Sequence, residues 1–179
     1  TQWFNRHWRG LSTLALMLFG PLAVASNLLA QQFPFNAIFL VSDPVQKWRL
    51  ALNFVLYLTP FLAGALYLGV VFQQAQKIFN RIYFADLAGS GICGLFLLLA
   101  MYALRPDDLI IVPLLLWAAG AILWFAAVGT MRHIIALGIV AALTIAAHFA
   151  LPPLLNIPKI AISDYKGVSY ARKFPDSQR

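Results

Sequence analysis

The chain has 179 residues, of which 61% are hydrophobic and only 11% charged, and its formal net charge is +7. A soluble domain normally has about 25% charged residues, so this composition excludes an ordinary soluble globular protein. The positive charge does not indicate a nucleic-acid partner, because the basic residues lie at the ends of apolar runs rather than on one folded face.

Five long apolar runs dominate the chain, and each approaches or exceeds the roughly 20 residues with which a helix crosses a bilayer core. The runs cover residues 11–30, 50–72, 84–104, 109–128 and 134–151. They are apolar on all sides, whereas membrane strands are short and alternate apolar with polar residues. The predicted fold is an all-α, polytopic integral membrane helix bundle with about five transmembrane helices. Residues 1–155 form this domain, and residues 156–179 are an extramembrane tail or the start of a soluble domain.

In chain order, the first run contains Gly20 and Pro21, which predict a bend because proline has no N–H to donate. Residues 31–47 then predict a loop at the membrane interface, since their apolar stretch is too short to span. The second run carries the small residues Ala65 and Gly69, which are candidates for close packing with another helix.

The basic residues near the first membrane face predict the topology. Short cytoplasmic loops are enriched in Lys and Arg, so this face is the better cytoplasmic candidate, and five crossings then place the tail on the opposite side. The tail has a basic cluster of its own, which favours the opposite orientation and leaves the alternative open. The residues of the first face are Arg6, Arg9, Lys77, Arg81 and Arg132.

Gly89, Gly91 and Gly94 match the glycine spacing of a dinucleotide-binding loop. That loop requires a preceding strand and exposed N–H groups, whereas these glycines lead directly into an apolar run. In a membrane helix, small residues let another helix approach closely, and Ser90 with Gly94 has the small-xxx-small spacing. We therefore interpret these four residues as a helix-packing surface.

Asp86 is the most suggestive single residue, because an acid at the edge of a membrane helix is costly unless it is paired or hydrated. Arg81 and Tyr83 precede it and could supply a cation and a hydroxyl. The three residues form a candidate polar site. The alternative is a structural one, in which the acid complements the start of a helix dipole.

No catalytic site, metal site or cofactor is predicted within this segment. Cys93 is the only cysteine, so no disulfide or cysteine-rich metal site can form within the chain. His133 and His148 fall on one predicted helix, but roughly 22 Å apart at 1.5 Å per residue, so they cannot share a metal.

Two segments resemble bacterial spermidine synthase-like membrane proteins. Residues 81–91 resemble a YFADLxGxxxG stretch in their membrane region, and residues 162–171 resemble a YKxLSxA segment that follows their last membrane helix. The tail motif consists of Tyr165, Lys166 and Ser169. Thr59, Pro60, Phe61 and Gly64 are similar to another helix of that family. The resemblance implies a soluble domain that transfers an aminopropyl group, but the residues for that chemistry are absent from this chain.

The expected function is that of a non-catalytic anchoring and interaction domain of a spermidine synthase-like protein, in the bacterial inner membrane. The expected partners are the lipid bilayer and other membrane helices or subunits, or a fused soluble domain. An accessory structural subunit of a larger membrane complex is the alternative, and a small-solute transporter is the third possibility. Whether the complete protein is an enzyme stays open.

Overall fold

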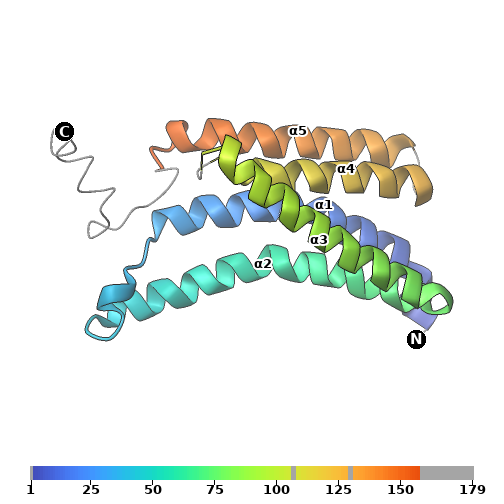
Figure 1. The fold of residues 1–179 in the computed structure, drawn as a ribbon, viewed down its shortest axis with the longest axis horizontal. Coiled ribbons are helices and arrows are strands. Elements are labelled where there is room, and N and C mark those ends of the chain that lie inside the picture. The colour runs from blue at the N-terminus through green and yellow to red at the C-terminus, as the bar shows by residue number, and fades with distance from the viewer. Residues whose placement is uncertain (1, 106–107, 129–130, 158–179) are drawn as a thin grey trace.

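A computed structural model describes residues 2–105, 108–128 and 131–157, and all regular structure in these ranges is helical. Figure 1 shows the helices running along one another as an elongated bundle. The helices are α1 (Gln2–Gln32), η1 (Ala37–Phe39), α2 (Pro44–Gln74), η2 (Gln76–Ile78), α3 (Phe79–Ala103), α4 (Ile111–Val128) and α5 (Met131–Leu154).

Four of these helices are long and apolar enough to cross a bilayer: α1, α2, α3 and α5. Helix α4 is also strongly apolar but has 18 residues, because a turn precedes Ile111. At 1.5 Å per residue it is about 27 Å long, at the short end of what spans a core of roughly 30 Å. The chain is an all-α, polytopic membrane helix bundle, as the apolar runs predict.

The helices extend beyond the apolar runs that identify them. Helix α1 continues for nine residues before Leu11, and α2 begins at Pro44 rather than near Leu50. Asp43 caps α2 with its carboxylate, which accepts a hydrogen bond from the Val45 N–H, and Pro44 occupies the first turn. The predicted loop at 31–47 is therefore shorter than expected, and its position at the membrane interface stays a prediction.

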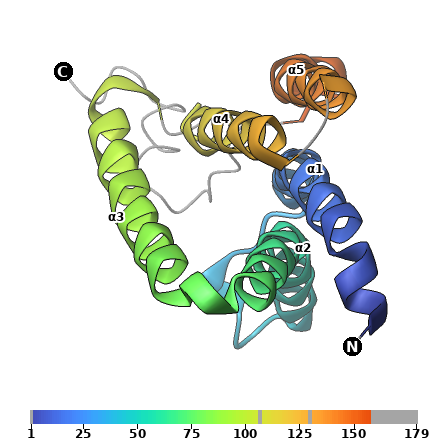
Figure 2. The ribbon, with the colours of Figure 1, turned by 90° about the vertical axis from the view of Figure 1, so that its right-hand side faces the viewer.

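Helix α1 is the centre of the bundle and packs against α2, α4 and α5. Figure 2 shows it between α2 and α5, with α4 beside it. The core consists of aliphatic and aromatic side chains from α1, α4 and α5, and its fully buried members include Leu114 and Leu137. The remaining core residues are Val24, Leu28, Trp117, Ala121, Phe125 and Ala141.

A close contact at the bend of α1 fixes α4 against it. The Trp117 ring lies against Gly20, where an added Cβ would stand 2.6 Å from Cη2 and 2.7 Å from Cε3 of the indole. The Trp117 Nε1–H donates to the Leu16 carbonyl at 2.7 Å. Pro21 has no N–H to donate to the carbonyl of Met17, which is the residue after Leu16.

Three side chains from the start of α2 hold the segment that follows α1. The Asn53 Nδ2 donates to the Phe33 carbonyl at 2.8 Å, and Arg49 donates to the Pro34 carbonyl at 3.2 Å. The Asn36 N–H donates to the Gln46 side-chain oxygen at 2.9 Å. These bonds give hydrogen-bond partners to backbone groups of the irregular segment between α1 and α2, which has no regular helix to supply them.

Candidate functional site

The predicted polar site lies in the first two turns of α3, but the structure does not join its members. Arg81 and Tyr83 are exposed, and the Tyr83 ring stacks on Phe79 at 5.9 Å between centroids. Asp86 is half-buried, and its backbone carbonyl accepts a hydrogen bond from the Ser90 hydroxyl at 2.8 Å. Within the described part of the chain, neither Arg81 nor Tyr83 bonds to the Asp86 carboxylate.

Helix α3 is the loosest member of the bundle, because none of its residues is buried. Figure 2 shows it standing apart from α1 while its two ends approach α2 and α4. Half-buried positions nevertheless recur at helical spacing along one face, at Ile82, Asp86, Cys93, Leu97 and Ala100. Asp86 and Cys93 are seven residues apart and therefore lie on the same inward face, about 10 Å from one another along the helix axis.

The predicted packing residues of α3 are helical, but they touch no other helix among the described residues. Gly89, Gly91 and Gly94 lie inside α3, so they form no strand–turn–helix loop for a dinucleotide. A Cβ added at any of them would meet nothing within 4 Å, and Ser90 is exposed. Their role as a contact for another polypeptide stays a prediction.

The predicted packing pair on α2 is likewise on the outside. Ala65 and Gly69 are exposed, and a Cβ at Gly69 would meet nothing within 4 Å. The small residue of α2 that approaches α1 is Gly64, where an added Cβ would lie 3.3 Å from Phe19. The sequence gives no reason to prefer Gly64 to Gly69 as the contact residue, because residue size alone does not show which side of a helix faces its neighbour.

One end of the bundle carries exposed cations on several helices. Helix α1 begins there, α2 ends there, and α3 and α5 begin there, as Figure 1 shows on the side of the N-terminus. Within the described residues, no carboxylate forms an ion pair with these cations, although the Arg9 guanidinium lies 5.4 Å from the centroid of the Trp8 ring. The residues of this basic end are Arg6, Arg9, Lys77, Arg81 and Arg132.

An aromatic cluster lies just inside the basic end. The Trp124 ring of α4 makes edge contacts with Trp8 of α1, at 6.5 Å between centroids, and with Tyr67 of α2, at 5.3 Å. Aromatic rings beside basic side chains are typical of the headgroup boundary of a membrane.

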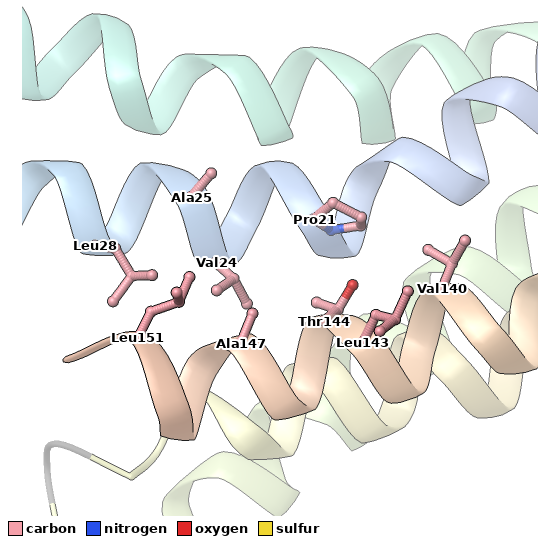
Figure 3. Close-up of a pocket in the computed structure, with 9 residues that line it drawn as sticks. All are labelled: Pro21, Val24, Ala25, Leu28, Val140, Leu143, Thr144, Ala147 and Leu151. Atoms are coloured by element: carbon pink, nitrogen blue, oxygen red, sulfur yellow. The ribbon is translucent and has the colours of Figure 1, made fainter. Parts of the chain in front are cut away.

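Two apolar grooves lie between the helices. The first, with a volume of about 380 Å³, runs between α1 and α5, and Figure 3 shows its walls and the change of direction of α1 at Pro21. Thr144 is the only polar side chain among its lining residues. Its walls are Pro21, Val24, Ala25, Leu28, Val140, Leu143, Thr144, Ala147 and Leu151.

The second groove, of about 310 Å³, lies between α1, α2, α3 and α4, and we call it the four-helix groove. The atoms that it exposes are all apolar. Cys93 is the lining residue from α3, and Trp117 closes the groove on the side of α4. Its other lining residues are Ala15, Leu16, Phe19, Gly64, Tyr67, Leu68, Pro113 and Leu116.

Among the described residues, no group of three or more His, Cys, Asp or Glu side chains has an arrangement that could hold a metal ion. His148 is buried in α5, and its ring makes an edge contact with Phe149 at 5.0 Å. The predicted tail motif of Tyr165, Lys166 and Ser169 lies outside the described residues. No protein-family model, curated protein or solved structure matches this chain.

Proposed function

We propose that this chain is a membrane-anchoring and assembly domain that performs no chemistry itself and packs against another helix or subunit through α3. The observation that carries the proposal is the exposure of α3: no residue of this apolar helix is buried against the described part of the chain. In lipid, helices associate through close van der Waals packing, which small residues permit. Ser90, Gly91 and Gly94 offer such a surface next to the half-buried face of α3, because their positions fall within about 100° around the helix.

Site-specific photo-crosslinking in native membranes tests this proposal. A photoreactive phenylalanine analogue replaces Leu98 on α3, which lies on the same side of the helix as Gly91 and Gly94, and the matched control replaces Ile139 on α5, which is exposed to a similar degree (61% and 56%). We expect adducts of discrete protein mass from position 98 and none from position 139. Adducts with lipid alone at both positions would contradict the assembly function.

The resemblance to spermidine synthase-like proteins supports a specific form of this proposal, in which the anchored partner is an aminopropyl-transferring domain in the bacterial inner membrane. The alternative is an accessory subunit of a larger complex, which the exposure of α3 supports equally. A coding sequence that continues past Arg179 into a glycine-rich strand–turn–helix with acidic residues favours the first form. A crosslinked partner encoded by a separate gene favours the second.

We also propose that the basic end faces the cytoplasm, because Lys and Arg are retained there during insertion. The tail then lies on the other side. A reporter that is active only in the cytoplasm, fused after Arg179, is expected to be silent, whereas the same reporter fused before Arg6 is active. The opposite result would assign the cytoplasmic side to the tail cluster and would restore the topology that an aminopropyl-transferring domain requires.

A further inference from the structure

We propose that the connection between α1 and α2 is a membrane anchor whose exposed apolar side chains enter the headgroup layer of the bilayer, at the end of the bundle opposite the basic end. We call residues 33–49 the α1–α2 cap, and Figure 1 shows them on the side away from the N-terminus. The partner of the cap is the lipid surface itself. The inference does not depend on the assembly function proposed above, because that function rests on α3.

Exposed apolar side chains are concentrated on the α1–α2 cap. Val41 is 91% exposed, Trp48 78% and Ile38 67%. Each large apolar side chain gains free energy when it leaves water, so a concentration of such side chains marks a surface that contacts protein or lipid. The other exposed apolar residues of the cap are Phe33, Phe35, Phe39 and Val45.

Side chains, rather than water, satisfy several backbone groups of the cap. A polar group that is already bonded loses little when water leaves it, whereas an unbonded one is costly to remove from water. The cap thus combines an apolar outside with an internally bonded backbone, which suits the headgroup layer better than bulk water. The backbone groups that bond to side chains are the carbonyls of Phe33 and Pro34 and the N–H groups of Asn36, Ile38 and Val45.

The length of α2 places the cap at the depth of the headgroups. The apolar part of this helix, residues 50–72, rises by about 33 Å and by itself covers a bilayer core of roughly 30 Å. Residues 44–49 precede this part and add about 9 Å. One headgroup layer is about 5–8 Å thick, because the whole bilayer measures about 40–45 Å. The first turns of α2 therefore cross this layer, and the connection before them lies at its surface.

The first turns of α2 carry two kinds of side chain that the headgroup layer favours. Trp48 is largely exposed, and the neighbouring Lys47 is exposed as well. Indole rings are enriched at membrane–water boundaries, and a lysine there extends its ammonium group to the phosphates while its alkyl stem stays among apolar groups. The Asp43 carboxylate accepts hydrogen bonds from the Gln46 side chain and the Val45 N–H, so it needs no water for these two bonds.

A lipid partner also matches the way in which the surface of the cap continues into α2. An apolar groove of about 510 Å³ is lined by Phe35 of the cap and by α2 residues from Leu50 to Phe61. Leu50 and Phe61 are about 16 Å apart along the helix, close to the roughly 15 Å depth of one leaflet of the core. A soluble protein could cover only the outer part of this continuous surface, whereas the bilayer that surrounds α2 covers both parts.

Depth measurements with spin labels test the insertion. Cys93 is the only cysteine, so Cys93→Ala provides a background in which single labelled cysteines replace chosen residues. Ile38→Cys places the label in η1 of the cap. Gln76→Cys is the matched control, because Gln76 is exposed in η2, another short 3-10 helix between two long helices. Phe61→Cys, at a 71% exposed position of α2, is the reference for hydrocarbon.

Power-saturation EPR in phosphatidylcholine vesicles compares the collisions of each label with oxygen, which concentrates in hydrocarbon, and with a nickel chelate, which stays in water. We expect the oxygen-to-nickel ratio at position 38 to exceed that at position 76 several-fold and to lie between those of positions 76 and 61. A ratio equal to that at position 76 would place the cap in water and overturn the proposal. Low collision rates with both reagents would show that a second copy of the chain covers the cap, which overturns it equally.

A further pair of variants tests the internally bonded backbone. Gln46→Met keeps the length of the side chain but cannot accept the hydrogen bond from the Asn36 N–H. It is expected to raise the collision rate of the label at position 38 with the nickel chelate several-fold, because the released N–H draws the connection toward water. Thr59→Val, which removes a bond between α1 and α2 outside the cap, is expected to leave that rate unchanged. Equal rates in the two variants, at equal helicity by circular dichroism, would remove the bonded backbone from the proposal.

Discussion

Replacing Gly20 with alanine tests whether the contact between α1 and α4 is as tight as the structure indicates. The added methyl would stand 2.6 and 2.7 Å from two carbons of the Trp117 ring, closer than real Cβ contacts occur. The indole is 93% buried and hydrogen-bonded to the Leu16 carbonyl, so it cannot move aside without loss. The helices must therefore separate slightly, or the indole must give up its bond.

The expected magnitude follows from two opposing effects. Overpacking of a tight contact costs about 1–3 kcal/mol, and a lost interhelical hydrogen bond in a membrane protein costs about 0.6 kcal/mol. Alanine gains about 1 kcal/mol over glycine from helix propensity. Gly20→Ala is thus expected to lower the free energy of unfolding by about 1–2 kcal/mol. Gly69→Ala is the matched control, because its methyl meets nothing within 4 Å, and it is expected to be neutral or slightly stabilising.

Titration with SDS in mixed micelles, followed by circular dichroism, measures these free energies. The decisive comparison is a double-mutant cycle with Trp117→Leu, which removes the ring that the new methyl would meet. In that background Gly20→Ala is expected to cost less than about 0.5 kcal/mol, so the two positions are coupled by 1 kcal/mol or more. Additive effects, or an equal loss in Gly69→Ala, would refute the close contact.

Four further substitutions test polar contacts of the bundle. Ser26→Ala and Thr59→Val each remove one side of a 3.1 Å hydrogen bond between α1 and α2, and each is expected to cost about 0.5–1 kcal/mol in the same titration, with the double variant costing less than the sum. Asn53→Leu leaves the Phe33 carbonyl without its side-chain donor and is expected to cost about 1–3 kcal/mol, whereas a neutral effect would show that the bond is replaced. For Asp43, hydrogen bonds from the Gln46 side chain and the Val45 N–H, together with the Arg49 charge, hold the pKa below the ordinary 3.8. Its contribution to stability is therefore complete above that value and is lost as the pH falls through the lowered pKa, so the unfolding temperature of the parent should drop more than that of Asp43→Asn between about pH 5 and pH 2.

The sequence predicts the number and the approximate places of the helices because an apolar run of sufficient length has few other stable structures in lipid. It also places the bend at Pro21 and keeps Gly89, Gly91 and Gly94 inside a helix. The ends of the helices are predicted less well. The apolar run begins at Leu11, but the helix already begins at Gln2, because polar residues can extend a helix beyond its apolar part.

The contacts between helices could not be predicted, because a helix that is apolar on all sides does not reveal which face meets a neighbour. Gly69 and Gly20 are both small residues in apolar runs, yet only Gly20 receives an aromatic ring. The missed signal is Trp117, whose indole N–H needs an acceptor. The sequence identifies Asp86 because a charged residue in an apolar run is conspicuous. It does not show that Cys93, on the same face of the helix, lines a groove between helices.

The central position of α1 has a consequence for how the protein is made. Its hydrogen bond with Trp117 joins residues that are 101 positions apart in the chain, whereas Ser26 and Thr59 are 33 apart. At a synthesis rate of about 5–20 residues per second, Trp117 is made some 5–20 seconds after Leu16, whereas Thr59 follows Ser26 within about 2–7 seconds. Until α4 and α5 are made, the surface of α1 that they cover in the complete bundle faces lipid or the insertion machinery.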